Sequence, residues 1–344
     1  PEGCRLFSLK LRHNPLGSLG TAAVCQTVQL AKTQLNELNL AWCGAGVETA
    51  SAIGAMLGSN SNCLLTRLDL RDNRGLGLNC ALSKAFLRHL APGNEALARP
   101  PIPSGPAKKA SPNKPGDRSA DALPQARAPK GTEAARHLRW LNLANIDLDG
   151  EGAALLASSL PAFQNLDELL LYNNALLGST PRTVEIYAGD EEKQVEKPPK
   201  MEKDKQAAAE GHPGLGNLVQ ALPLKLRILS LASCGLGPIL VAKVLKHLAS
   251  QQFLQELDLS DNDLGLGSSE HPDLLMGSQG ETLRRALEHF IQTCPKLRIL
   301  NLALNILGDH PALAIVTALC FDAAAVTVDF CANQLSDDFK ACLR

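Results

Sequence analysis

Large aromatic side chains are scarce in this sequence. Of its 344 residues only 3% are aromatic, with two Trp and two Tyr. A core must therefore be built from Leu, Ala, Val and Ile, with few rings to fill gaps. Long apolar runs are also missing, because none approaches the roughly 18 residues that span a bilayer. The formal net charge is −1, which gives no electrostatic reason to expect nucleic acid or an anionic membrane as a partner.

Sequence signatures of catalysis and metal binding are missing too. There is no C-x-x-C pair, and no two of the eight His have helical ligand spacing, so no metal site is predicted. Neither G-x-x-x-x-G-K-[ST] nor G-x-S-x-G occurs. Gly75-Leu-Gly77 and Gly265-Leu-Gly267 lack the third glycine of a dinucleotide fingerprint and fit turns after strands instead. We therefore predict no enzyme activity, no cofactor and no small-molecule substrate.

What is present is leucine at a fixed spacing. The pattern L-x-x-L-x-L-x-x-(N/C)-x-L recurs nine times, most clearly at 254–264 and 297–307. Further copies start at Leu6, Leu35, Leu65, Leu138, Leu166 and Leu226, and a weaker last copy runs from Ala325 to Leu335. Neighbouring copies start 28–30 residues apart, except across three intervals that contain insertions. A repeat of this length indicates a solenoid, in which successive units share one core.

Each repeat predicts a strand followed by a helix. The L-x-L core alternates with period two, so its leucines point inward and their neighbours outward. The Asn or Cys that follows is expected to bond the backbone of its own and the adjacent turn, forming a ladder down the stack. Ile146 occupies this position in one repeat, so the ladder should break there unless Asn145 compensates. Helical spacing of apolar residues follows at 48–57, 81–90, 152–160, 239–248 and 281–291.

These features resemble the ribonuclease-inhibitor-like class of leucine-rich-repeat proteins. The resemblance implies an α/β solenoid, a curved horseshoe with parallel strands on the concave face and helices on the convex face. It covers residues 1–344 as one domain of about nine repeats, apart from the insertions. The class is intracellular, contains free thiols and mostly binds proteins. It includes ribonuclease inhibitor, the Ran GTPase-activating protein, the sensing arrays of NOD-like receptors and several axonemal or cytoskeletal proteins.

Three insertions interrupt the repeats. The first, about 92–135, is rich in Pro, Ala, Lys and Gly and is predicted to be disordered. The second, about 179–213, is strongly charged with mixed sign and is also predicted to be disordered, and the third, about 265–280, is a short loop. Because the first follows a helix and the others follow strands, they should leave from opposite rims. They are either solvated loops or segments that fold onto a partner.

The cysteines and the start of the chain bear on its cellular setting. Ten cysteines are scattered along the sequence, which predicts buried free thiols and a reducing compartment, the cytoplasm or the nucleus. The chain begins with Pro1 and is interpreted as a fragment. The first repeat starts at Leu6 with almost nothing to cap it, so further repeats or another domain are expected upstream.

The concave face is where a binding site is expected. Three of the four Trp and Tyr residues map to outward strand positions or the turns after them. Such rings either pack flat on the sheet or act as anchors for a partner, since Trp, Tyr and Arg dominate binding energies. The predicted partner-binding residues, mostly in the N-terminal half, are Trp42, Arg67, Arg71, Asp72, Trp140, Asn142 and Tyr172.

The hypothesis from sequence is a non-catalytic scaffold that binds an unidentified protein, as a subunit of a larger cytosolic, nuclear or ciliary assembly. Two alternatives stay open. A regulator of a small GTPase would use polar groups at the rim. The sensing arm of a NOD-like receptor would require an upstream nucleotide-binding domain.

Overall fold

The computed structural model describes residues 6–30, 34–58, 64–91, 133–176, 213–265, 278–321 and 326–342. Within them, nine strands form one parallel sheet in chain order, β1 to β9. The strands are β1 Ser8–Lys10, β2 Glu37–Asn39, β3 Arg67–Asp69, β4 Trp140–Asn142, β5 Glu168–Leu170, β6 Ile228–Ser230, β7 Glu256–Asp258, β8 Ile299–Asn301 and β9 Thr327–Asp329. The sequence prediction of a parallel, leucine-rich-repeat solenoid is confirmed.

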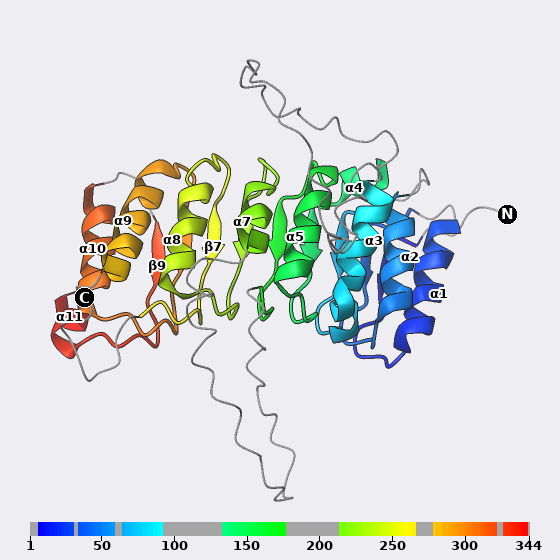
Figure 1. Ribbon diagram of the computed structural model, residues 1–344, viewed down its shortest axis with the longest axis horizontal. Coiled ribbons are helices and arrows are strands. Elements are labelled where there is room, and N and C mark those ends of the chain that lie inside the picture. The colour runs from blue at the N-terminus through cyan, green and yellow to red at the C-terminus, as the bar shows by residue number, and fades with distance from the viewer. Residues whose placement is uncertain are drawn as a thin grey trace, which may run out of the picture.

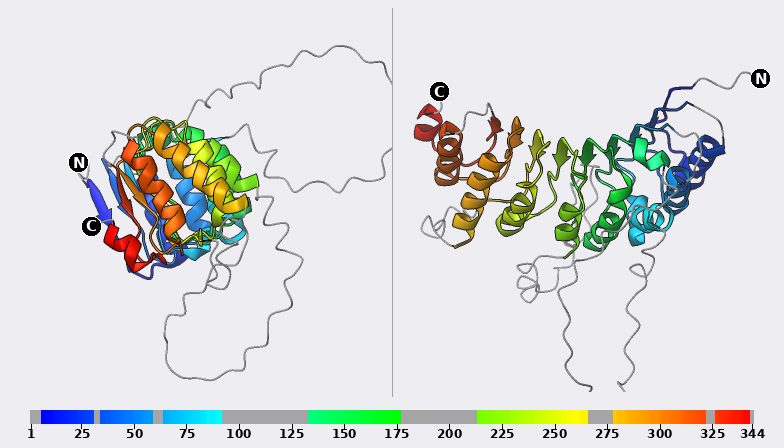
Figure 2. Two further views of the ribbon diagram at one scale, coloured as in Figure 1. Left: turned by 90° about the vertical axis from the view of Figure 1, so that its left-hand side faces the viewer. Right: turned by 90° about the horizontal axis from the view of Figure 1, so that it is seen from above.

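Helices cover one face of this sheet (Figure 1). They are α1 Gly17–Leu30, α2 Val47–Gly58, α3 Ala81–Leu90, α4 Glu133–His137, α5 Gly150–Ser159, α7 Pro213–Gln220, α8 Gly237–Leu248, α9 Ser278–Thr293, α10 Asp309–Phe321 and α11 Asp337–Cys342. Short 3-10 helices lie at Arg74–Leu76, Leu78–Cys80 and Leu160–Ala162. Seen along the strands' edge, the layer of strands lies on the inner side of a shallow curve and the helices on the outer side (Figure 2). Helices are wider than strands, so stacking the two side by side bends the array.

The predicted insertions lie almost wholly outside the described residues, and only their ends can be compared. Helix α4 begins at Glu133, inside the predicted range 92–135, so the end of that range is helical. Helix α7 begins at Pro213 and α9 at Ser278, at or just before the predicted ends of the second and third insertions. Each of these helices therefore begins at or before the residue at which the sequence predicted that the insertion ends.

The central strand leucines form the spine of the core. Leu38, Leu68, Leu141, Leu169 and their counterparts up to Leu300 are fully buried. They join the inward faces of the helices in a single cluster that extends along the array. Full burial of one such leucine contributes about 1.5–3 kcal/mol relative to exposure. In the first and last repeats, Leu9 and Val328 are only partly buried against this cluster, because each has a neighbour on one side only.

Asparagine side chains in several of the turns tie a repeat to the one before it. Asn262 donates from Nδ2 to the Leu231 and Leu259 carbonyls at 2.8 and 3.0 Å. Its Oδ1 accepts from the backbone N–H of Cys234 and Leu236 at 3.1 and 3.2 Å. One side chain thus satisfies four backbone groups of two repeats, which would otherwise be buried without partners. The same arrangement recurs at Asn73, Asn174 and Asn333.

Cysteine and isoleucine replace asparagine in three repeats. Cys43 Sγ donates to the Leu11 carbonyl at 3.0 Å, and Cys234 Sγ donates to the Leu171 carbonyl at 3.4 Å. The thiol therefore retains one donor of the amide but offers no strong acceptor. Ile146 is fully buried and leaves the predicted gap. Beside it, Asn145 donates to Asp72 Oδ1 of the preceding repeat at 2.7 Å, so a bond at the rim links the two repeats there.

The turn after every strand contains a residue with positive φ. Nine non-glycine residues hold this position with φ between 51° and 62°: His13, Trp42, Asp72, Asn145, Asn173, Ser233, Asp261, Leu304 and Ala332. A left-handed conformation costs roughly 1–2 kcal/mol for an ordinary residue. The cost recurs in every repeat because this backbone reversal directs the next side chain, the ladder residue, into the core.

One glycine of each predicted pair, Gly77 and Gly265, lies in the loop that follows β3 or β7, and Gly267 lies outside the described residues. Gly77 donates its N–H to the Ile146 carbonyl at 2.8 Å, and a Cβ at Gly77 would lie 2.2 Å from that oxygen. Gly265 donates its N–H to the Asn305 carbonyl of the next repeat, and a Cβ at Gly265 would clash with the Ile306 carbonyl. Glycine is required at both because the backbones of adjacent repeats meet there.

We expect two substitutions of Asn262 to destabilise the protein to different extents. Asn262→Ala should lower the free energy of unfolding by roughly 2–4 kcal/mol, because it leaves several buried backbone groups unpaired. Asn262→Cys should lose less, since a thiol already serves at positions 43 and 234. Urea unfolding followed by circular dichroism measures both. Equal losses for the two variants would show that the side chain matters for volume and not for hydrogen bonding.

Candidate functional site: the concave face

The parallel register places equivalent side chains of neighbouring repeats next to one another on the concave face. Arg67 pairs with Trp140, and Trp140 with Glu168. Two rows result, one on each side of the buried central leucines. The first row is Ser8, Glu37, Arg67, Trp140, Glu168, Ile228, Glu256, Ile299 and Thr327; the second row is Lys10, Asn39, Asp69, Asn142, Leu170, Ser230, Asp258, Asn301 and Asp329.

Trp140 and Arg67 form a pair in the first row. The guanidinium carbon of Arg67 lies 4.6 Å from the centroid of the Trp140 ring. A cation over an aromatic face contributes about 0.5–1 kcal/mol at an exposed site. Trp140 is half-buried and Arg67 is exposed, so the pair presents a flat, cationic surface to the concavity.

Asp69, Arg71 and Tyr172 form a second cluster, which spans three repeats. Asn39 Nδ2 donates to Asp69 Oδ2 at 3.0 Å, and Arg71 Nε lies 3.6 Å from the same oxygen. A hydrogen bond to the Tyr172 hydroxyl raises the pKa of Arg71. Arg71 and Tyr172 occupy the same turn position two repeats apart, and the small Ala144 between them leaves room for this contact.

The remaining predicted residues lie at the edges of these clusters. Asp72 accepts the hydrogen bond from Asn145 already described. Trp42 is 49% exposed and stacks on His13, with ring centroids 5.7 Å apart. Asn142 is only 1% exposed, and its Oδ1 accepts from the Ala144 N–H. It therefore supports the sheet and offers a partner almost no surface.

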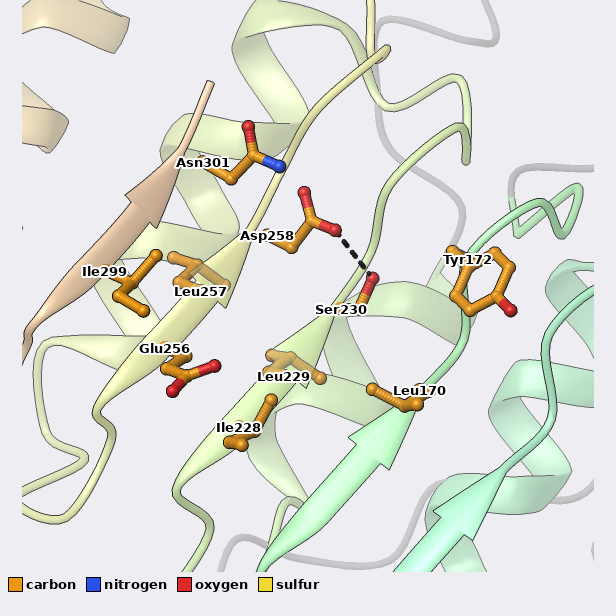
Figure 3. Close-up of a pocket in the computed structure, with 10 residues that line it drawn as sticks. All are labelled: Leu170, Tyr172, Ile228, Leu229, Ser230, Glu256, Leu257, Asp258, Ile299 and Asn301. Atoms are coloured by element: carbon orange, nitrogen blue, oxygen red, sulfur yellow. Dashed lines mark hydrogen bonds between the residues drawn. The ribbon is translucent and has the colours of Figure 1, made fainter. Parts of the chain in front are cut away.

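The structure also shows a feature that sequence reasoning missed. A hollow of about 300 Å³ opens on the C-terminal half of the concave face, across β5 to β8 (Figure 3). Its lining residues are Leu170, Tyr172, Ile228, Leu229, Ser230, Glu256, Leu257, Asp258, Ile299 and Asn301. Of the predicted residues only Tyr172 belongs to it. The available signal was Leu170, Ile228 and Ile299, apolar residues at strand positions that point away from the core.

The described cysteines and acidic residues do not assemble into a reactive centre. Six cysteines whose side chains the structure describes are free thiols: Cys43, Cys80, Cys234 and Cys294 are buried, and Cys331 and Cys342 are exposed. Burial raises the pKa of Cys80 and Cys234 to about 12, which keeps both protonated and unreactive at neutral pH. Among the described residues, no group of three or more His, Cys, Asp or Glu is placed to hold a metal ion. No described helix has both the length and the apolarity to cross a membrane.

A comparison with protein-family models agrees with the repeat. Residues 250–266, which include β7, match a family model described as Leucine Rich repeat. No curated protein sequence matches the chain at a significant level. A crystal structure of the leucine-rich repeat-containing protein LegL7 from Legionella pneumophila is similar at 18% identity, with a TM-score of 0.41, and the match covers 88% of this chain and 67% of that one.

Two carboxylates of the second row should respond to pH with opposite signs. Burial raises the pKa of Asp69, so the folded protein holds that proton to a higher pH than the unfolded chain. The contribution of Asp69 to stability therefore falls as pH rises from the unfolded pKa near 3.8 through the raised folded value, and stays low above it. Hydrogen bonds from Cys331 lower the pKa of Asp329, so its contribution is present above the unfolded pKa and is lost on acidification.

We expect Asp69→Asn to raise the urea midpoint at pH 7 and this gain to shrink as the pH falls toward 4. Asp329→Asn is the matched control and should lower the urea midpoint at pH 7. The difference in midpoint between this variant and the wild type should also shrink as the pH falls. Unfolding curves at a series of pH values measure both. A gain for Asp69→Asn that grows on acidification would contradict the assignment.

Proposed function

Because this chain is a leucine-rich-repeat protein, we propose that it is a non-catalytic scaffold that binds a partner protein through its concave face. The observation that carries the proposal is the ordered set of aromatic and charged side chains on β3 to β5 and in the turns that follow β3 and β5. Trp140 under Arg67, and Tyr172 against Arg71, are held in place by neighbours within the sheet. Side chains already fixed in position lose little conformational entropy on binding.

The N-terminal half of the concavity has the composition of a binding hot spot. Trp, Tyr and Arg are enriched among the residues that dominate interface energies. Trp42 contributes a large, half-exposed ring at the edge of this surface. Trp42, Arg67, Arg71, Asp72, Trp140 and Tyr172 are therefore the proposed contact residues, and Asn142 supports them from within the sheet.

The chemistry of this surface favours a protein partner over nucleic acid. Arg67 and Arg71 alternate with Asp69 and Asp72 along β3 and the turn after it, and Glu168 lies in the first row two repeats further on. A phosphate backbone would require a continuous basic path, and these carboxylates interrupt it. Side chains of both signs suit a protein surface of mixed charge.

We also propose that the protein acts in a reducing compartment, the cytoplasm or the nucleus, as a subunit of a larger assembly. The six free thiols described above support this setting, since oxidising compartments favour disulfides. Exposed Cys331 and Cys342 are the thiols that an oxidising environment would modify first.

The proposal predicts that the concave rings carry binding energy. Trp42→Ala and Trp140→Ala should each cost at least about 2 kcal/mol, or roughly 30-fold in Kd. Affinity purification with the wild type and the double variant would identify the proteins lost with the rings. Titration calorimetry with the purified partner then gives the Kd values.

Phe253→Ala is the matched control. Phe253 is 44% exposed and has Lys296 Nζ 4.3 Å from its ring centroid, but it precedes β7 outside both concave rows. It repeats the cation–ring pair of Arg67 and Trp140 away from the proposed surface. Unchanged affinity in both Trp variants, or an equal loss in Phe253→Ala, would exclude the concave rings as anchors.

A further inference from the structure

The hollow across β5 to β8 combines an apolar floor with acidic groups. In the first row, Glu256 pairs in register with Ile228 on one side and Ile299 on the other. Adjacent strands lie about 4.8 Å apart, so the glutamate stands between two aliphatic side chains, as the close-up shows (Figure 3). Ile299 is 41% exposed. One long side chain laid along this row would touch both an apolar surface and a carboxylate.

The second row supplies another carboxylate and a further apolar surface. Asp258 Oδ1 accepts from the Ser260 hydroxyl at 2.7 Å and from its backbone N–H at 3.1 Å. Oδ2 accepts from the Ser230 hydroxyl at 3.2 Å. These bonds fix the carboxylate at the edge of the hollow. Leu170 and Tyr172 lie at the opposite side, on β5 and the turn that follows it.

The negative charge of the hollow is not neutralised within the described part of the chain. Neither Glu256 nor Asp258 takes part in any of the ion pairs found there. Glu168, in the same row, has a pKa raised first by burial and also by the nearby charge of Glu256. Two carboxylates thus repel each other across Ile228, which a cation placed between them would relieve.

The two basic side chains that act on Glu168 have other partners. Arg67 lies over the Trp140 ring, and Arg227 Nη2 donates to Gln255 Oε1 at 2.9 Å. Both partly offset the charge of Glu168, but neither is among the residues that line the hollow.

We propose that this hollow binds a Lys or Arg side chain of the partner protein, together with an aliphatic residue next to it. The methylene stem of the basic residue packs on Ile228 and Ile299 while its cation reaches Glu256 and Asp258, since long basic side chains bury their stems and keep their charge at polar groups. The neighbouring aliphatic side chain covers Leu170 and the ring of Tyr172. This inference rests on the proposed function and names the chemistry that a second part of the same face would recognise.

Selection from a phage-displayed library of random eight-residue peptides on the full chain tests the proposal. We expect the selected peptides to share a Lys or Arg adjacent to Leu, Ile, Val or Met. Synthetic copies, labelled for fluorescence polarisation, should bind at least tenfold more weakly to Glu256→Lys and to Ile228→Lys. Glu256→Gln, which keeps the shape of the side chain, should show a loss of the same direction and smaller size.

The control variants separate this proposal from the proposed function. Phe253 lies outside the hollow and outside the proposed contact residues, so Phe253→Ala should leave peptide binding unchanged. The protein partner should bind more weakly to Trp42→Ala and also to Glu256→Lys. Peptide binding that is lost in Glu256→Lys, with partner binding insensitive to Trp42→Ala, would contradict the proposed anchors and support the hollow.

Three results would overturn the proposal. Selected peptides without basic residues would exclude the cation, and peptide binding unaffected by either Glu256→Lys or Ile228→Lys would place the contact elsewhere. Peptide binding that appears only after deletion of residues 179–212 would assign the hollow to that Lys-containing segment of the chain itself. Circular dichroism and urea midpoints of each variant, compared with the wild type, establish that both substitutions leave the fold intact.

Discussion

The structure depends on how buried backbone groups are satisfied in the turn after each strand. A chain that reverses direction inside a core leaves N–H and carbonyl groups without partners, and each such group costs about 1–3 kcal/mol if it stays unpaired. Here the amide of the next repeat supplies the partners, as Asn262 does for Cys234 and Leu236. No repeat can satisfy its own turn completely, so stability comes from stacking and the repeats are joined in strict register.

That register also creates the concave surface proposed to bind a partner. Because the central leucines must all face the helices, the residues on either side must all face the concavity, and equivalent positions become neighbours across the whole sheet. The N-terminal half of the wall uses this placement for contacts within the protein, such as Arg67 over Trp140. In the C-terminal half, Ile228 and Ile299 flank Glu256 and leave a hollow. The two halves thus offer a partner different chemistry on one continuous surface.

The fold could be predicted from the sequence because the same strand-and-turn motif occurs nine times. The L-x-L core fixed nearly every strand, and the Asn, Cys or Ile that follows correctly predicted the ladder and its gap at Ile146. The site was harder to predict, because exposure depends on neighbours in adjacent repeats. Asn142 looked like an outward polar residue and is buried. The hollow went unnoticed since Leu170, Ile228 and Ile299 come from separate repeats and resemble ordinary core residues one at a time.

Amide hydrogen exchange of the full chain, alone and with the partner recovered by affinity purification, tests the central claim most directly. The account predicts that added protection falls on the strands from β2 to β8 and the turns after them, with α2, α5 and α8 exchanging as before. Protection confined to those helices, with the strands unchanged, would show that the partner binds the convex face and would contradict the account.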